Sequence, residues 1–82
     1  MARRKKKMAA RLIVAENIRK IRECRGYSQE RLGEICDLHR TYVSSVERGK
    51  RNITVDSIER FAIALGVSIP TLFDEDLSVE NL

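Results

Sequence analysis

The residues best suited to molecular recognition are four polar side chains in one short stretch: Arg40, Thr41, Ser44 and Ser45. Val43 and Val46 are interspersed with them at a spacing typical of a helix with one apolar and one polar face. An arginine can donate two hydrogen bonds to one guanine, and hydroxyl groups can bond to several base edges. The stretch therefore predicts a helix face suited to reading DNA bases, although such a face taken alone is also typical of a solvated surface.

The sequence contains no comparable set of residues suited to catalysis. His39 is the only histidine, and no Ser/His/Asp, Cys/His or metal-ligand arrangement can be built around it. Glycine-rich phosphate loops are absent from the sequence. Cys24 and Cys36 are too few for a disulfide scaffold and do not form a CxxC pair, so we expect both to be reduced. We predict no enzyme activity, no metal and no cofactor.

The charge is divided unevenly along the 82 residues, which total +4. Residues 1–25 carry ten Lys/Arg and two Asp/Glu, residues 26–53 carry five and four, and residues 54–82 carry one and six. One end should attract polyanions, as expected for a protein that presents one face to nucleic acid. No run approaches the ~18 apolar residues of a membrane span, and Arg11 and Glu16 interrupt any secretory leader. We therefore expect a cytoplasmic protein.

Apolar spacing and turn residues predict an all-α domain of five helices. Val14, Ile18 and Ile21 define the inner face of a helix over residues 9–25, and Gly26 ends it. Further helices are predicted over residues 29–36, 40–48 and 54–65, and a last short one opens at Ser68. Ser28 and Thr54 are predicted N-caps. We assign residues 1–8 to a basic arm, 9–74 to the folded domain and 75–82 to an acidic tail.

The predicted inner faces define the core. In the second helix they include Leu32, Ile35 and Cys36, and Leu12 and Ile13 extend the apolar side of the first. The remaining inward residues are Leu38, Val43, Val46, Ile58, Phe61, Ala62 and Leu65. Between the second and third helices, Asp37 is suited to the left-handed conformation that a tight turn needs.

Two short helices joined by such a turn form a helix-turn-helix, in which one helix enters the major groove and the other braces it. The stretches 28–32, 38–44 and 46–52, followed by 64–67 and 72–73, resemble the lambda-repressor-like (Cro/XRE) helix-turn-helix family. The residues His39 to Tyr42, together with Glu47, Arg48 and Gly49, also resemble controller proteins of restriction–modification operons, which are small dimeric regulators.

The resemblance implies a role for each matching position. Arg40, Thr41, Ser44 and Ser45 are expected to face base edges, and Arg22 and Glu47 to form an internal ion pair. Gly33 stands where the family usually has alanine, and Asp37 where it usually has glycine. We expect Gly33 to cost helix propensity and to permit closer packing. Expected contacts to the DNA backbone, or to both backbone and bases, come from Gln29, Tyr42, Arg48, Lys50, Arg51 and Asn52.

Two regions keep more than one interpretation. Residues 3–7 are a solubilising tail, an arm that binds phosphates, or an arm in a neighbouring groove; if they bind, deleting residues 2–7 should reduce the salt dependence of DNA affinity. The apolar residues near the C-terminus exceed what the segment can bury, so part of them should form a dimer contact, or else they close the core while the tail frays. The predicted contact comprises Val67, Ile69, Leu72 and Phe73.

Together these features predict a regulator of transcription that binds a two-fold symmetric operator in double-stranded DNA, most simply as a homodimer. The alternative is an antitoxin-like module whose acidic tail binds an unknown protein partner in addition to the operator.

Overall fold

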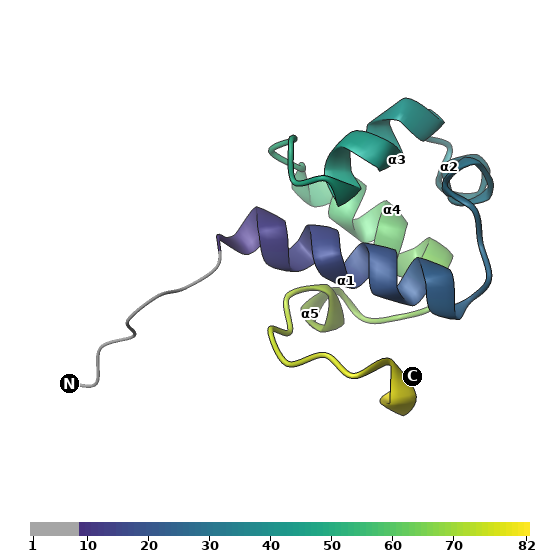
Figure 1. Cartoon of the computed structure of the whole chain (residues 1–82). Helices are drawn as coiled ribbons and strands as arrows, with labels where there is room; N and C mark the ends of the chain where they lie inside the picture. The colour runs from purple at the N-terminus through teal and green to yellow at the C-terminus, as the bar shows by residue number, and fades with distance from the viewer. Residues whose placement is uncertain (1–8) are drawn as a thin grey trace.

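A computed structural model describes residues 9–82, and the predicted basic arm, residues 1–8, lies outside the described residues (Figure 1). The five predicted helices are confirmed in their predicted order, and residues 9–82 contain no strand. A short 3-10 helix, η1 (Val79–Asn81), was not predicted. The α-helices are α1 (Ala10–Cys24), α2 (Gln29–Cys36), α3 (Arg40–Glu47), α4 (Val55–Leu65) and α5 (Ile69–Leu72).

Helices α2 to α5 each begin at a side chain that accepts a hydrogen bond from a backbone N–H of the first turn, which satisfies a donor that the helix itself leaves open. The predicted caps Ser28 and Thr54 are confirmed, at 2.9 and 3.1 Å. Ser68 caps α5 at 3.4 Å. The cap of α3 was not predicted: it is His39, whose Nδ1 accepts from the Thr41 N–H at 3.0 Å.

At their C-terminal ends, the same helices receive hydrogen bonds from other parts of the fold. Backbone carbonyls left open at a helix end need such donors, and arginine also suits the negative end of the helix dipole. Three arginines therefore link helices that are far apart in sequence. The bonds are Arg60 Nη1 to Asp37 O (3.3 Å), Arg11 Nε to Gly49 O (3.1 Å), Arg25 Nε to Leu65 O (3.0 Å), and Asn17 Nδ2 to Leu72 O (3.0 Å) and Asp74 O (2.8 Å).

The core lies where α1, α4 and α5 meet α2 and α3, and it contains the predicted apolar faces. Two predictions were wrong. Ile35 and Leu12 are both 38% exposed, because α2 turns Leu32, Gly33 and Cys36 inward and Leu12 lies at the edge of α1. The fully enclosed side chains are Val14, Ile18, Ile21, Leu32, Val43, Phe61, Leu65 and Leu72.

The arrangement leaves α3 at the periphery. In Figure 1, α2 and α3 lie on one side of α1, and α5 and the C-terminal segment lie on the other. Leu77 packs against the core and η1 contacts α1, so the segment after α5 is folded against the domain. None of the described helices is long and apolar enough to cross a membrane.

Candidate nucleic-acid interface

The turn between α2 and α3 depends on two unusual residues. Asp37 adopts the left-handed conformation expected of it, with φ 61° and ψ 43°. The Leu38 N–H then donates to the Gly33 carbonyl at 2.8 Å. A Cβ on Gly33 would lie 2.5 Å from the Leu38 backbone oxygen, closer than side-chain contacts allow. Gly33 therefore permits the turn to fold directly onto α2, as expected from the sequence.

The outward face of α3 carries the four side chains predicted to face base edges. Val43 and Val46 are buried against the core, so the four polar residues lie on the side of α3 that faces away from it. Arg40 and Thr41 are exposed at the start of α3, and Ser44 and Ser45 are half-buried further along it. The helix thus presents donors and acceptors along its outer side.

His39 orients the start of this helix, a role that the sequence analysis missed. Its Nδ1 lies 2.7 Å from Thr41 Oγ1, in addition to accepting from the Thr41 N–H. One imidazole therefore holds both the first turn of α3 and the side chain of Thr41. The sequence signal for this role is the position of His39, which directly precedes the first helical residue.

Tyr42 is half-buried and packs against the core. Its hydroxyl donates to Ser57 Oγ at 3.2 Å, which joins α3 to α4. The guanidinium carbon of Arg51 lies 5.3 Å from the centre of the Tyr42 ring, a distance typical of a cation–π contact. Tyr42 therefore supports a basic residue of the following loop.

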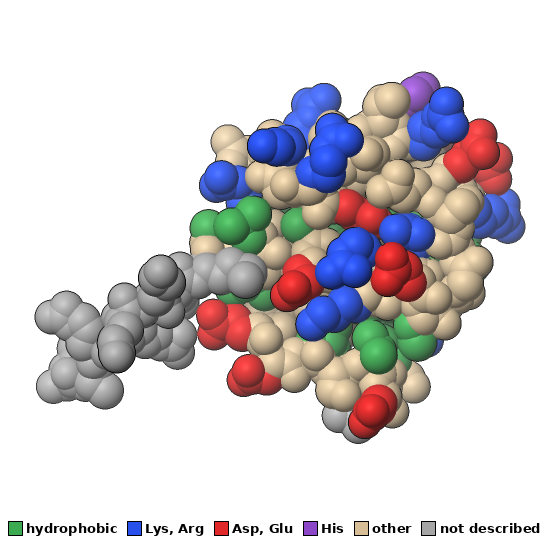
Figure 2. Space-filling model, viewed as in Figure 1, with side chains coloured by type: hydrophobic (Ala, Val, Ile, Leu, Met, Phe, Trp, Pro, Cys, Tyr) green, Lys and Arg blue, Asp and Glu red, His purple; other side chains and the backbone are tan. Residues whose placement is uncertain are grey.

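That loop carries the four residues predicted to contact phosphates at the end of α3: Arg48, Lys50, Arg51 and Asn52. All four are exposed. Arg48 Nη1 donates to Ser44 Oγ at 3.1 Å, so it bends back along the outer face of α3. Figure 2 shows Lys and Arg side chains gathered over α3 and the loop that follows it. The basic loop therefore adjoins the polar face of α3.

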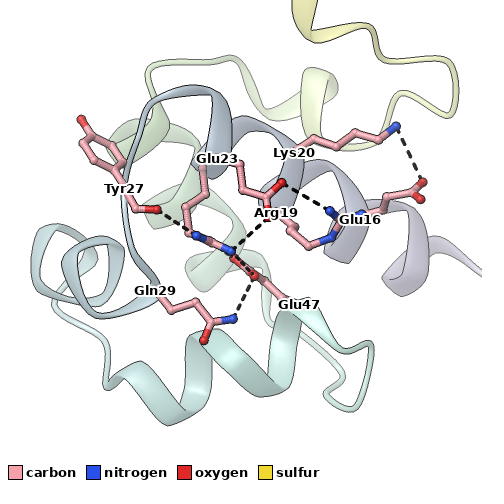
Figure 3. A network of polar contacts seen from close by, with 8 residues as sticks. Glu16, Arg19, Lys20, Glu23, Tyr27, Gln29 and Glu47 are labelled. Atoms are coloured by element: carbon pink, nitrogen blue, oxygen red, sulfur yellow. Dashed lines mark hydrogen bonds and ion pairs between the residues drawn. The ribbon is translucent and has the colours of Figure 1, made fainter.

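A buried ion pair supports this surface from behind, as the family resemblance implies. Arg22 Nε and Nη2 donate to the two carboxylate oxygens of Glu47 at 2.6 and 3.0 Å (Figure 3). Arg22 Nη1 donates to the Tyr27 carbonyl at 2.8 Å. The hydrogen bond to Glu47 outweighs partial burial and raises the pKa of Arg22 above its ordinary value. The Glu47 side chain is only 3% exposed, so its charge is neutralised away from the outer face.

Gln29, predicted to contact phosphate, is part of the same network. Its Nε2 donates to Glu47 Oε1 at 3.0 Å, and the side chain is seen beside Glu47 in Figure 3. One carboxylate therefore links α1, α2 and α3. The bond fixes Gln29 at the start of α2, next to the helix that it braces.

The predicted dimer contact needs correction. Leu72 is fully buried, because α5 inserts it into the core, and Val67 is partly buried against the same core. Neither of these two side chains is a free apolar surface. Ile69 and Phe73 are 40% and 42% exposed. The sequence analysis missed Ile63, which is 75% exposed on the outer side of α4.

Across residues 9–82, no group of three or more His, Cys, Asp or Glu side chains is arranged to hold a metal ion. Cys36 is buried and Cys24 is exposed, and both are free thiols. Burial raises the pKa of the Cys36 thiol to about 11, although Arg60 acts in the opposite direction.

Comparison with known proteins places this geometry in a family. The helix-turn-helix family pattern matches residues 18–72, more than half of the chain. The chain belongs to the Cro/XRE-type helix-turn-helix family. The resemblance drawn from the sequence and the lambda-repressor-like fold that it implied are both confirmed.

Several relatives within this Cro/XRE-type family are control proteins. The chain is 48% identical over 65 residues to control protein C.BamHI of Bacillus amyloliquefaciens, covering 78% of this chain and 80% of that one. It is 50% identical over 60 residues to control protein C.SmaI of Serratia marcescens, covering 73% and 71%. The crystal structure of the restriction-modification controller protein C.AhdI from Aeromonas hydrophila matches with a TM-score of 0.76 at 36% identity, covering 80% of this chain and 100% of that one.

Proposed function

We propose that this protein is a transcriptional regulator of the restriction–modification controller type, which binds a specific double-stranded DNA sequence as a homodimer. The observation that carries the proposal is the outward face of α3. It is polar along its length, exposed at its start, and continuous with a basic loop. The control proteins to which this chain is similar support its assignment as a transcriptional regulator. As part of the same proposal, the protein acts in the cytoplasm.

In the proposed complex, α3 enters the major groove, which is about 12 Å wide and accepts one helix. Arg40 is suited to bidentate bonds with guanine, and Thr41 to a hydroxyl or methyl contact. Ser44 and Ser45 lie further along the same side. Phosphates are bound by Lys50, Arg51 and Asn52, with Arg48 and Tyr42 contacting backbone or base and Gln29 contacting the backbone beside α2.

The homodimer is proposed to form through the exposed apolar side chains of α4 and α5. Ile63, Ile69 and Phe73 are exposed in the folded monomer, and Val67, between α4 and α5 in the sequence, is partly buried against the core. A two-fold symmetric contact between these surfaces buries them in both subunits. Each subunit then presents one α3, and half-sites about 34 Å apart match one helical turn of DNA.

We keep the division of the chain made from the sequence. Residues 9–74 form the DNA-binding domain, residues 1–8 a basic arm, and residues 75–82 an acidic segment, which folds against α1 through η1. The domain contains every side chain that we assign to the DNA.

Selection from a random duplex library at about 150 mM salt, where non-specific binding is weakened, tests the function. A two-fold symmetric consensus with half-sites one helical turn apart is the expected result. A consensus with a single half-site would reject the dimer but retain DNA reading. No enrichment by a folded protein would reject sequence-specific binding and favour a protein partner instead.

A further inference from the structure

Arg11 occupies a position that helix electrostatics disfavour. It lies in the first turn of α1, where the helix dipole repels positive charge, and that turn contains no acidic residue. Its Nε donates to the Gly49 carbonyl at 3.1 Å, across 38 residues of sequence. Arg11 is thus held against the loop that follows α3.

The neighbouring residue reinforces this contact. Gly49 is buried, with φ 72°, and a Cβ at that position would overlap Leu12 Cδ2. Arg11 and Leu12 therefore hold Gly49 from its carbonyl and from its α-carbon. The start of α1 is therefore joined to the loop 48–52 at Gly49, the residue directly before Lys50.

The Gly49 bond uses only one of the guanidinium nitrogens. Arg11 is exposed, and no residue of the described chain accepts a hydrogen bond from its Nη1 or Nη2 or forms an ion pair with it. A guanidinium presents five N–H donors in a planar fork that matches phosphate oxygens. Its Nε is occupied by the Gly49 carbonyl, so its two terminal nitrogens remain available to a phosphate.

We propose that Arg11 binds a backbone phosphate of the DNA and so extends the interface from α3 and its loop onto the start of α1. The ligand is a phosphodiester group of the duplex, bound without sequence preference. This inference rests on the proposed function, because it requires that α3 and the loop face DNA.

The test measures the affinity of Arg11→Gln for the selected operator and for a random duplex over a range of salt concentrations. Each phosphate contact adds about 0.9 to the slope of log affinity against log salt. We expect Arg11→Gln to lower this slope by about 0.9 and to weaken both duplexes by the same factor. Arg11→Lys, which restores the charge, is expected to restore the slope.

Arg19→Gln is the matched control, because it removes the same charge from α1. Arg19 contacts Glu23 on the exposed side of the helix, as Figure 3 shows. Its slope should equal that of the wild type. If Arg11→Gln and Arg19→Gln lower the slope equally, the effect is one of overall charge and the proposal is overturned.

Circular dichroism establishes that each variant is folded, and Arg11→Met provides a second neutral side chain if Arg11→Gln is not. A folded neutral variant that binds more weakly with an unchanged slope would show that Arg11 only positions the loop, which overturns the phosphate contact. Failure of the proposed function is distinguishable, since the wild-type protein would then show no salt-dependent duplex binding at all.

Discussion

Glu47 Oε1 and Oε2 accept two parallel hydrogen bonds from Arg22, so that helices α1 and α3 are joined by a single bidentate ion pair. The Arg22 side chain is 12% exposed and the Glu47 side chain 3% exposed. Because Gln29 bonds to the same carboxylate, this pair also sets the relation of α2 to α3. One acidic residue therefore links the proposed recognition helix to both α1 and α2.

Glu47→Ala should lower the free energy of unfolding by about 3–5 kcal/mol, because the nearly buried Arg22 guanidinium loses both bonds to Glu47 and is left with a 3.8 Å pair to the exposed Glu23. Urea denaturation followed by circular dichroism measures this loss. The matched control is Glu34→Ala, which breaks the Arg31–Glu34 pair, whose side chains are 60% and 61% exposed. That change should cost at most about 1 kcal/mol. Equal losses in the two variants would contradict a structural role for Glu47.

Substitutions at two positions near the turn between α2 and α3 should change the stability of the fold in opposite directions. Gly33→Ala should destabilise the fold by about 1–3 kcal/mol, since the added Cβ meets the Leu38 backbone oxygen and overpacks the turn. Asp37→Gly should stabilise it by up to about 1 kcal/mol, because glycine adopts the left-handed conformation without steric cost. Removing a negative charge from the C-terminal end of α2 acts in the same direction. Thermal unfolding of both variants checks the two signs, and a stabilising Gly33→Ala would refute the close approach.

Much of this fold could be predicted because its helix boundaries depend on local residues. Ser28 and Thr54 cap helices, and Asp37 and Gly66 end them in left-handed conformations. These effects act within a few residues, so the sequence pattern contains them. The spacing of buried residues in α4 is equally local, and all four of its predicted inward side chains are buried.

What could not be predicted depends on contacts between distant segments. Arg11 reaches Gly49 and Tyr42 reaches Ser57, and no local pattern indicates either bond. A helix of four or eight residues also has too few turns to define its inward side from spacing alone. For that reason Ile35 was assigned to the core and Leu72 to the dimer surface, and the structure reverses both.

Truncating two basic residues of the proposed interface to alanine should change DNA binding in different ways. Arg40→Ala should weaken operator binding by about 1–3 kcal/mol and relax specificity at one base pair, because Arg40 stands at the exposed start of α3. Lys50→Ala should weaken all sequences alike and reduce the salt slope by about 1, as expected for a phosphate contact. Repeating the duplex selection with each variant measures both effects. If Arg40→Ala weakens every sequence equally, its assignment to a base edge is wrong.

The proposed dimer contact can be tested without disturbing the core. Ile63→Glu adds a charge where the side chain is 75% exposed, so the monomer should remain folded while the dimer dissociates. Val55→Glu is the matched control: Val55 is 77% exposed on the same helix, about 12 Å from Ile63 along its axis. Sedimentation at tens of micromolar protein should detect monomers only for Ile63→Glu. Wild-type protein that is monomeric under these conditions would reject the dimer.

The two cysteines should differ sharply in reactivity. The thiolate is the nucleophile, and with a pKa of about 11 only roughly one Cys36 in a thousand is ionised at pH 8, in addition to its burial. Ellman's reagent should therefore modify one thiol rapidly in the native protein and both in denaturant, and Cys24→Ser should abolish the rapid phase.

Because folding raises the pKa of Cys36 above its ordinary value of 9.0, its contribution to stability should be complete below pH 9 and lost as the pH rises toward 11. Cys36→Ala should remove that part of the pH dependence, and an unchanged profile would show that Cys36 does not titrate in the folded protein.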